Sequence, residues 1–243
     1  APTEENAHPH LSNDGRFAVV HNGIIENYLT LREELTGQGY HFDSETDTEV
    51  VIKLVDYYYK KYKIGPVDAI NRMMVRVKGS YALVLMFRDY PGEIYAARKD
   101  SPLIIGVTGN ETFAASDVPA ILKYTRTVYY IGNLECARLV PGAVTFYDLN
   151  GDEVEKETSE ITWDAQAAEK GGFEHFMIKE IHEQPQAMRD TLNSLVKEGS
   201  VDLSASGLTK EIMEGVSSIY IVGCGSAWHV GIASQYILED MAK

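Results

Sequence analysis

Apolar side chains recur at helical spacing between residues 30 and 79, the first strongly patterned part of the chain. The spacing predicts a short helix over 30–38, a second over 46–62 and a third from 66 to just before Gly79. The third helix begins at a proline, a residue favoured in the first helical turn. Its predicted core-facing side chains are Ile70, Met73 and Met74.

From Ser80 onward the pattern becomes that of strands. The run 81–87 is almost continuously apolar, as in strands covered on both faces, and turn residues after it predict that 93–97 returns as its partner. Further strands are predicted at 103–107, 111–115, 128–131, 137–140 and 144–147, with one short helix at about 118–124. Early helices followed by many sequential strands indicate an α+β domain with layered sheets.

The last part of the chain predicts a second kind of structure. Composition turns polar over 150–172, and we place the edge of the first domain at 165–172. A helical pattern resumes at Glu174 and contains Pro185, where a break or kink is expected. The apolar run 219–222 leads into a Gly-rich turn and another helix, the unit that opens a doubly wound α/β domain.

Composition narrows the class of protein. The chain has 243 residues, is 44% hydrophobic and 24% charged, and carries a formal net charge of −14, which argues against nucleic acid or an anionic membrane as the main partner. The two cysteines, Cys136 and Cys224, cannot form a disulfide framework, and no metal-ligand spacing is present. No stretch has the length of a membrane span or the pattern of a targeting signal, so a cytoplasmic protein is expected.

The stretch from Phe17 to Asn27 carries the candidate chemistry. Asn22-Gly23 lies between two apolar runs, and from this spacing alone a tight hairpin is the favoured interpretation. The same dipeptide also offers an Asn amide beside a Gly N–H, two donors that can converge on one oxygen as in an oxyanion hole.

Several motifs together resemble one enzyme family. Residues 21–27, with Asn6-Ala7-His8-Pro9-His10 before them and Ser44-Glu45-Thr46-Asp47-Thr48-Glu49 after them, are similar to the glutaminase domain of the glucosamine-6-phosphate synthases, the glutamine:fructose-6-phosphate aminotransferases. The resemblance continues through 179–185 and 223–226, in the same order, and so covers nearly the whole chain.

The resemblance implies a fold and a domain organisation. It implies a four-layer αββα N-terminal-nucleophile domain (class II glutamine amidotransferase) over 1–168, a linker over 169–185, and the beginning of an α/β sugar isomerase (SIS) domain over 186–243. A glutamine phosphoribosylpyrophosphate amidotransferase fits less well, because such enzymes lack the sugar isomerase segment.

The resemblance also assigns roles to residues. Asn22 and Gly23 match the oxyanion positions, and Asp47 matches the residue that holds the α-ammonium of glutamine. Thr46 and Glu49 form a capping box, so Asp47 is expected in the first turn of a helix, where the dipole favours a carboxylate.

A second site is implied near the end of the chain. Gly225 and Ser226 match the first phosphosugar-binding turn, although Ala227 replaces a residue that supplies a second hydroxyl in the family. The segment 180–185 matches the linker that couples sugar binding to glutamine hydrolysis, but it also fits a plain surface helix. Cys224 is expected to be packed.

The implied reaction takes the amide nitrogen of glutamine to fructose 6-phosphate, without a metal or organic cofactor, in a homo-oligomer formed through the isomerase half. The family's nucleophile is an N-terminal cysteine; this chain opens at Ala1 and stops at Lys243, and both ends are expected to be cuts in a longer polypeptide. Cys136 is expected to be a buried hydrophobe, so the 243-residue chain should not hydrolyse glutamine. The alternative is a non-catalytic module that binds glutamine or a sugar phosphate.

Overall fold

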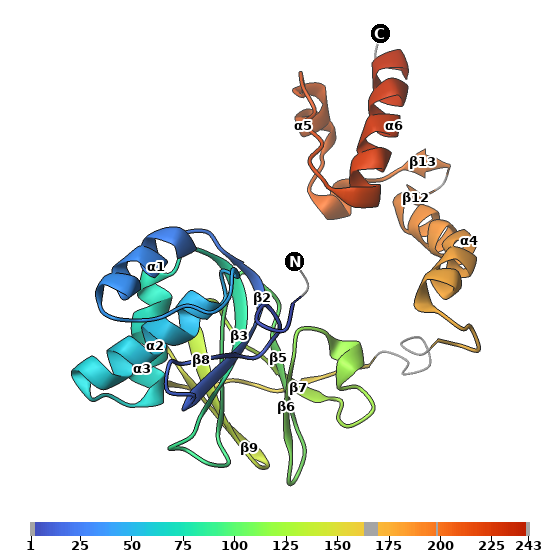
Figure 1. The fold of residues 1–243 in the computed structure, drawn as a ribbon. Coiled ribbons are helices and arrows are strands. Elements are labelled where there is room, and N and C mark those ends of the chain that lie inside the picture. The colour runs from blue at the N-terminus through green and yellow to red at the C-terminus, as the bar shows by residue number, and fades with distance from the viewer. Residues whose placement is uncertain (1–2, 163–169, 198, 242–243) are drawn as a thin grey trace. The chain divides into compact units, whose positions relative to one another are not determined.

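The computed structural model describes residues 3–162, 170–197 and 199–241, and these fall into two compact units, Ala1–Gly171 and Gly172–Lys243. Figure 1 shows the elements of both. Ala1, Lys243 and most of the predicted domain edge at 165–172 lie outside the described residues. Each unit is described by itself.

The first unit is built on two antiparallel sheets. The larger sheet has the strand order β1-β2-β3-β4-β8-β9-β10 and the smaller sheet the order β11-β7-β5-β6. The strands of the larger sheet are β1 (His10–Leu11), β2 (Phe17–Ile25), β3 (Gly79–Phe87), β4 (Ile94–Lys99), β8 (Glu135–Val140), β9 (Ala143–Tyr147) and β10 (Glu153–Val154). Those of the smaller sheet are β5 (Ile104–Val107), β6 (Thr112–Ala115), β7 (Thr127–Tyr130) and β11 (Ser159–Glu160).

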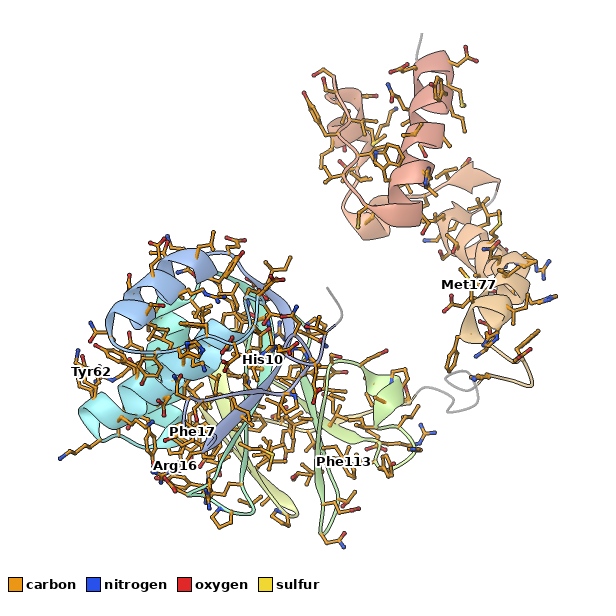
Figure 2. All side chains as sticks on the ribbon, in the orientation of Figure 1. His10, Arg16, Phe17, Tyr62, Phe113 and Met177 are labelled. Carbon is orange, nitrogen blue, oxygen red and sulfur yellow. The ribbon has the colours of Figure 1, made fainter. Side chains whose placement is uncertain are left out.

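Three helices cover one face of the larger sheet (Figure 1). They are α1 (Tyr28–Gly37), α2 (Glu49–Tyr62) and α3 (Pro66–Arg76). Ile70, Met73 and Met74 of α3 are buried in this layer, as their spacing predicted. The sheet contributes alternate residues of β2 and β3, including Phe17, which lies between the strands and the helices in Figure 2.

The other face of the larger sheet packs against the smaller sheet. Small residues of the larger sheet, Ala82, Ala96 and Ala137, share one buried cluster with Ile105 of β5. The ring of Tyr129 in β7 lies 5.3 Å from that of Phe146 in β9. Small side chains allow two sheets to approach closely, and this cluster forms the interface between the two sheets.

The outer face of the smaller sheet is covered by a short segment instead of an α-helix. The predicted helix at 118–124 is a 3₁₀ turn, η1 (Val118–Ala120), followed by turn residues. Val118, Ile121 and Leu122 from this segment pack on Ile104 and Val128. The described part of this unit is therefore an α+β arrangement of helices on a two-sheet sandwich.

The hairpin that the Asn22-Gly23 spacing alone favours does not form. Strand β2 runs through both residues and pairs with β3 along its whole length, from Phe17 opposite Phe87 to Ile25 opposite Gly79. The chain reverses after Ile25 and passes through the three helices before it returns as β3. Local turn propensity is outweighed here by a long ladder of hydrogen bonds to a strand distant in sequence.

The second unit has two long helices and short elements between them. The elements are α4 (Phe176–Leu195), β12 (Val196–Lys197), β13 (Ser200–Val201), η3 (Ser204–Ser206), α5 (Lys210–Glu214) and α6 (Gly225–Met241). Helix α4 continues through Pro185, so the predicted break is absent. Met177 near its start is exposed and points away from the helix in Figure 2. No helix among the described residues is both long and apolar enough to span a membrane.

The predicted strand at 219–222 is not formed. Residues 216–224 have no regular structure, and the side chain of Val222 is 95% exposed. A parallel strand is stable only when neighbouring strands satisfy its backbone, and no described segment pairs with this one. Cys224, expected to be packed, is exposed for the same reason.

Candidate functional site

Gly23 has a backbone conformation that only glycine accommodates. Its φ is +133°, and a Cβ built on it would lie 2.1 Å from the carbonyl oxygen of Ser80 on β3. L-residues rarely adopt such φ values, and here the backbone leaves no space for a side chain. The close approach of β2 and β3 therefore requires glycine at this position.

Asn22 lies on the face of β2 that is turned toward the sandwich. It pairs with Ala82, which belongs to the cluster between the two sheets, but its own side chain is exposed. The Nδ2 atom donates a hydrogen bond of 3.4 Å to Oγ of Ser116, just beyond β6. The amide is thus accessible at the margin of the sandwich, beside Gly23.

Asp47 is brought to the same strand by a loop that precedes α2. We call residues 43–48 the Asp47 loop. Asp47 Oδ2 accepts a hydrogen bond of 2.6 Å from the backbone N–H of Ile25, and Thr48 Oγ1 lies 2.9 Å from Nδ1 of His21. The two contacts attach the loop to β2 at His21 and Ile25, so Asp47 is held at the same strand that carries Asn22 and Gly23.

The predicted capping box is wrong. Helix α2 begins at Glu49 with Thr48 as N-cap, so Asp47 lies before the helix and not in its first turn. Thr46 Oγ1 contacts Oγ of Ser44 and Nε2 of His10, and Glu49 does not reach back to Thr46. The capping box does not form because the buried Glu49 carboxylate accepts hydrogen bonds from other donors, such as the Ser44 hydroxyl.

Two histidines flank this region and favour their neutral forms. Burial lowers the pKa of His21 against the opposing effect of Asp47, and burial also lowers the pKa of His10. His10 Nε2 lies 3.1 Å from Thr46 Oγ1. Nε2 of His21 is buried without a hydrogen-bond partner among the described residues.

Cys136 is confirmed as a small buried hydrophobe. Its side chain lies in the helix-facing core, and burial raises the pKa of its thiol to about 12. A nucleophilic cysteine requires an accessible thiolate, so this residue cannot serve as one.

In the second unit, Gly225 and Ser226 begin helix α6. Gly225 has a φ of +57°, and both residues are exposed. The first turn of this long helix presents backbone N–H groups, which favour an anion. The motif was predicted as a strand, a Gly-rich turn and a helix. The strand is absent, and of this motif the described residues form the start of the helix.

A buried charged stripe on α2 was missed from the sequence. Glu49, Lys53 and Asp56 are each at most 3% exposed, although all three carry ionisable side chains. Glu49 and Lys53 are four residues apart, as are Asp56 and Lys60, and pairs at this spacing normally lie on solvated helix faces. The apolar residues Val50, Val51, Leu54 and Val55 alone therefore gave no sign that the charges are buried as well.

Residues 2–123 match the model of the glutamine amidotransferase domain family. The chain is 49% identical over its full length to the glutamine–fructose-6-phosphate aminotransferase (isomerizing) of Caldanaerobacter subterraneus, 49% to that of Clostridium acetobutylicum and 43% to that of Thermus thermophilus. It spans about 40% of the length of these relatives.

Among solved structures, the chain is similar to the glutamine phosphoribosylpyrophosphate amidotransferase of B. subtilis. The TM-score is 0.51 at 25% identity, covering 63% of this chain and 34% of that one. A second structure, described as the allosteric regulatory enzyme of purine biosynthesis, gives the same TM-score at 22% identity over 61% of this chain and 32% of its own, and supports the fold alone. With half of its length matched by the family model, this chain belongs to the glutamine amidotransferase domain family.

Proposed function

We propose that the polypeptide containing this chain transfers the amide nitrogen of glutamine to fructose 6-phosphate, forming glucosamine 6-phosphate and glutamate. The observation that carries the proposal is the attachment of the Asp47 loop to β2 beside Asn22 and the glycine-only conformation of Gly23. Relatives at 43–49% identity bear the name of this aminotransferase, which supports the same reaction.

In this proposal Asn22 and Gly23 stabilise negative charge on the amide oxygen of glutamine. Acyl transfer from an amide passes through a tetrahedral intermediate, and donors preorganised around its oxygen lower the barrier. The Nδ2 group of Asn22 is exposed and weakly engaged by Ser116, so it is available to a substrate. Gly23 contributes its backbone N–H as the second donor to that oxygen.

Asp47 binds the α-ammonium at the other end of the substrate. One of its oxygens accepts the Ile25 N–H, which orients the carboxylate, and Oδ1 has no partner among the described residues. A carboxylate held this way binds an ammonium with a charge-assisted hydrogen bond. The distance between the ammonium and the amide of glutamine then selects for an amino acid of that length.

Gly225 and Ser226 bind the phosphate of the sugar through the N-terminus of α6 and the Ser226 hydroxyl. The proposal extends to the finer architecture: a four-layer αββα N-terminal-nucleophile domain over 1–168, a linker over 169–185 and the beginning of a sugar isomerase domain over 186–243. It also includes a cytoplasmic location and a homo-oligomer.

The test uses the polypeptide expressed from the complete reading frame that contains this chain. We expect glutamate release from glutamine, and glucosamine 6-phosphate when fructose 6-phosphate is added. Asp47→Asn should raise the KM for glutamine by about a hundredfold, because the ammonium loses a charged partner, while the KM for fructose 6-phosphate stays within about twofold. Glutamine binding without glutamate release would indicate a binding module in place of an enzyme.

A further inference from the structure

Glu49 and Lys53 form an ion pair inside the helical layer of the first unit. Their side chains are 4% and 2% exposed, and Lys53 Nζ lies 3.0 Å from Glu49 Oε1. Removing two charges from water is costly, and apolar residues of similar volume often stabilise a core equally well. The pair therefore calls for an explanation other than core stability, and its hydrogen bonds supply one.

The Glu49 carboxylate is the anchor of the Asp47 loop. It accepts hydrogen bonds from the backbone N–H groups of Asp43 and Ser44, at 3.1 and 2.8 Å, and from the Ser44 hydroxyl at 2.7 Å. From the other side, Arg32 Nη1 donates to the carbonyl oxygen of Ser44 at 2.8 Å. The backbone at the start of the loop is thus held by hydrogen bonds to two charged side chains, Glu49 and Arg32.

From Ser44 a directional chain of hydrogen bonds leads along the loop. An ionised carboxylate only accepts, so the Ser44 hydroxyl must donate its one proton to Glu49. In the 3.0 Å contact between the two hydroxyls, Thr46 must then be the donor. Its proton is used there, so His10 Nε2 must carry a hydrogen and donate to Thr46 at 3.1 Å. The charge on Glu49 thereby sets the orientation of each group up to the His10 ring.

Both sequence neighbours of Asp47 are held in place, one by these hydrogen bonds and the other by β2. Thr46 precedes it, and Thr48, which follows, contacts His21. With both neighbours fixed, the Asp47 carboxylate is directed onto the Ile25 N–H. Residues 40–48 lack regular secondary structure, so these side-chain contacts, together with packing, determine the loop conformation.

We propose that the buried Glu49–Lys53 pair is a positioning device for Asp47, holding the Asp47 loop in the conformation that receives the α-ammonium of the amino-acid substrate. The substrate role of Asp47 rests on the proposed function; the positioning of its carboxylate does not. Lys53 holds the Glu49 carboxylate in place, and Ser44 transmits that restraint to the loop.

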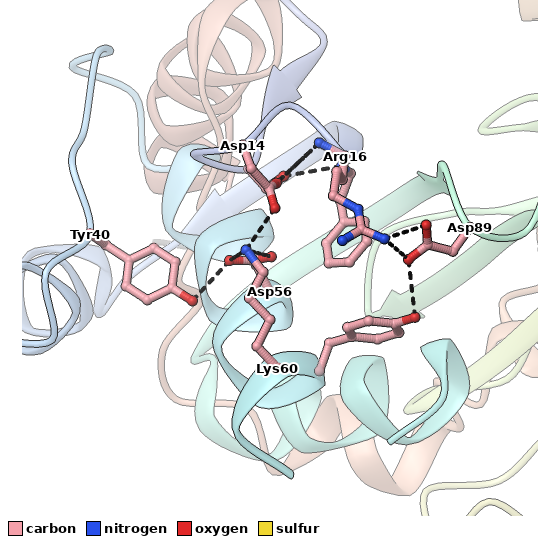
Figure 3. A network of polar contacts seen from close by, with 9 residues as sticks. Asp14, Arg16, Tyr40, Asp56, Lys60 and Asp89 are labelled. Carbon is pink, nitrogen blue, oxygen red and sulfur yellow. Dashed lines mark hydrogen bonds and ion pairs between the residues drawn. The ribbon is translucent and has the colours of Figure 1, made fainter. Parts of the chain in front are cut away.

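The helix contains a matched control two turns further on. Asp56 and Lys60 form an ion pair of the same spacing, with Asp56 1% exposed and its carboxylate 2.8 Å from Lys60 Nζ. Figure 3 shows this pair bonded to Asp14 and Tyr40. Among the described residues, neither side chain has a hydrogen bond or ion pair to the Asp47 loop. Asp56→Asn therefore damages the core without touching the proposed device.

The first readout is kinetic and uses the polypeptide from the complete reading frame. In Glu49→Gln, one carboxylate oxygen becomes an NH₂ group. This group cannot accept a hydrogen bond from the N–H donors that face it, so the loop loses at least one of its hydrogen bonds to residue 49. We expect the KM for glutamine to rise by about tenfold with kcat changed less than about threefold. Ser44→Ala, which leaves the ion pair in place and removes the link to Thr46, should change KM in the same direction. Asp56→Asn should leave KM within about twofold.

The second readout is magnetic resonance on the 243-residue chain, which does not depend on activity. In the unsubstituted chain we expect the Ile25 amide to be protected from exchange and His10 to be the Nε2–H tautomer. Glu49→Gln and Ser44→Ala should both lower the Ile25 protection by about tenfold or more, and Asp56→Asn should not.

Unchanged KM and unchanged Ile25 protection in both loop variants would overturn the proposal. Equal effects from Asp56→Asn would also overturn it, since they would reflect a general loss of stability. If the unsubstituted polypeptide releases no glutamate, the proposed function fails, while the resonance measurements still decide whether the pair positions Asp47.

Discussion

At the scale of single residues, Gly23 is the position with the least freedom in the candidate site. A side chain there would collide with the Ser80 carbonyl and would also need an unfavourable φ. Neither cost can be relieved by rotating a flexible group, because the obstacle is backbone. The residue that the proposed function places at the oxyanion is thus also required by the strand pairing.

Gly23→Ala should lower the free energy of unfolding of the first unit by about 2 kcal/mol or more, from strain and backbone overlap. Gly37→Ala is the control, since Gly37 ends helix α1 and no atom outside the local helix backbone lies within 4 Å of the position that an added methyl group would take. That change should be neutral or stabilising by up to about 1 kcal/mol. Urea denaturation followed by circular dichroism measures both; equal stabilities for the two variants would contradict the backbone collision.

At the scale of elements, helix α2 connects the core to the candidate site. Its apolar residues pack under β2 and β3, and its first turn carries the buried carboxylate that anchors the Asp47 loop. Burial raises the pKa of Glu49, but the hydrogen bonds from Ser44, Lys53 and Asp43 outweigh it and leave that pKa below its ordinary value. The loop is therefore coupled to the charge state of one residue.

This coupling predicts how stability changes with pH. A carboxylate with a lowered pKa in the folded state contributes stability above its unfolded pKa, near 4.5, and loses it as pH falls through the folded value. The unfolding free energy of the first unit should therefore fall as the solution is acidified below about pH 4.5, and Glu49→Gln should flatten that fall. Glu45→Gln removes the same charge from an exposed side chain and serves as control. Parallel curves for all three proteins would contradict the prediction.

At the scale of the whole molecule, the two units differ in how they bury apolar surface. The first has three buried clusters that include most of its strands and helices. In the second, large apolar residues on α4 and α6 are exposed, among them Met177, Trp228 and Tyr236. The two cysteines lie one in each unit, Cys136 buried and Cys224 exposed, and report on the units separately.

Thiol labelling should proceed in two well-separated steps. Cys224 should react with a disulfide reagent at once in the native chain, and Cys136 only as the first unit unfolds, because it is fully buried and burial raises the pKa of its thiol to about 12. The stepwise absorbance change, repeated in urea, measures both. The variants Cys224→Ser and Cys136→Ala assign each step, and prompt labelling of two thiols in native protein would contradict the burial of Cys136.

The sequence alone determined much of the helical layer and most of the strands. Helices over 28–37, 49–62 and 66–76 and strands β3 to β9 form close to where the pattern of apolar residues predicted them. Each helix buries one apolar face, and β3 and β4 are covered on both faces. It also brought Asn22, Gly23 and Asp47 to attention through a family resemblance, before any geometry was known.

How those residues are held depends on contacts between distant parts of the chain. Asn22-Gly23 lies within a strand because β3 pairs with it from a distant part of the chain, and Asp47 meets Ile25 because the Asp47 loop is anchored by Glu49. The buried charges of α2 have the spacing of a surface pair, so periodicity could not place them inside. The apolar run 219–222 has the composition of a strand but no partner among the described residues. Pairing, burial and anchoring depend on neighbours remote in sequence, which a local pattern does not contain.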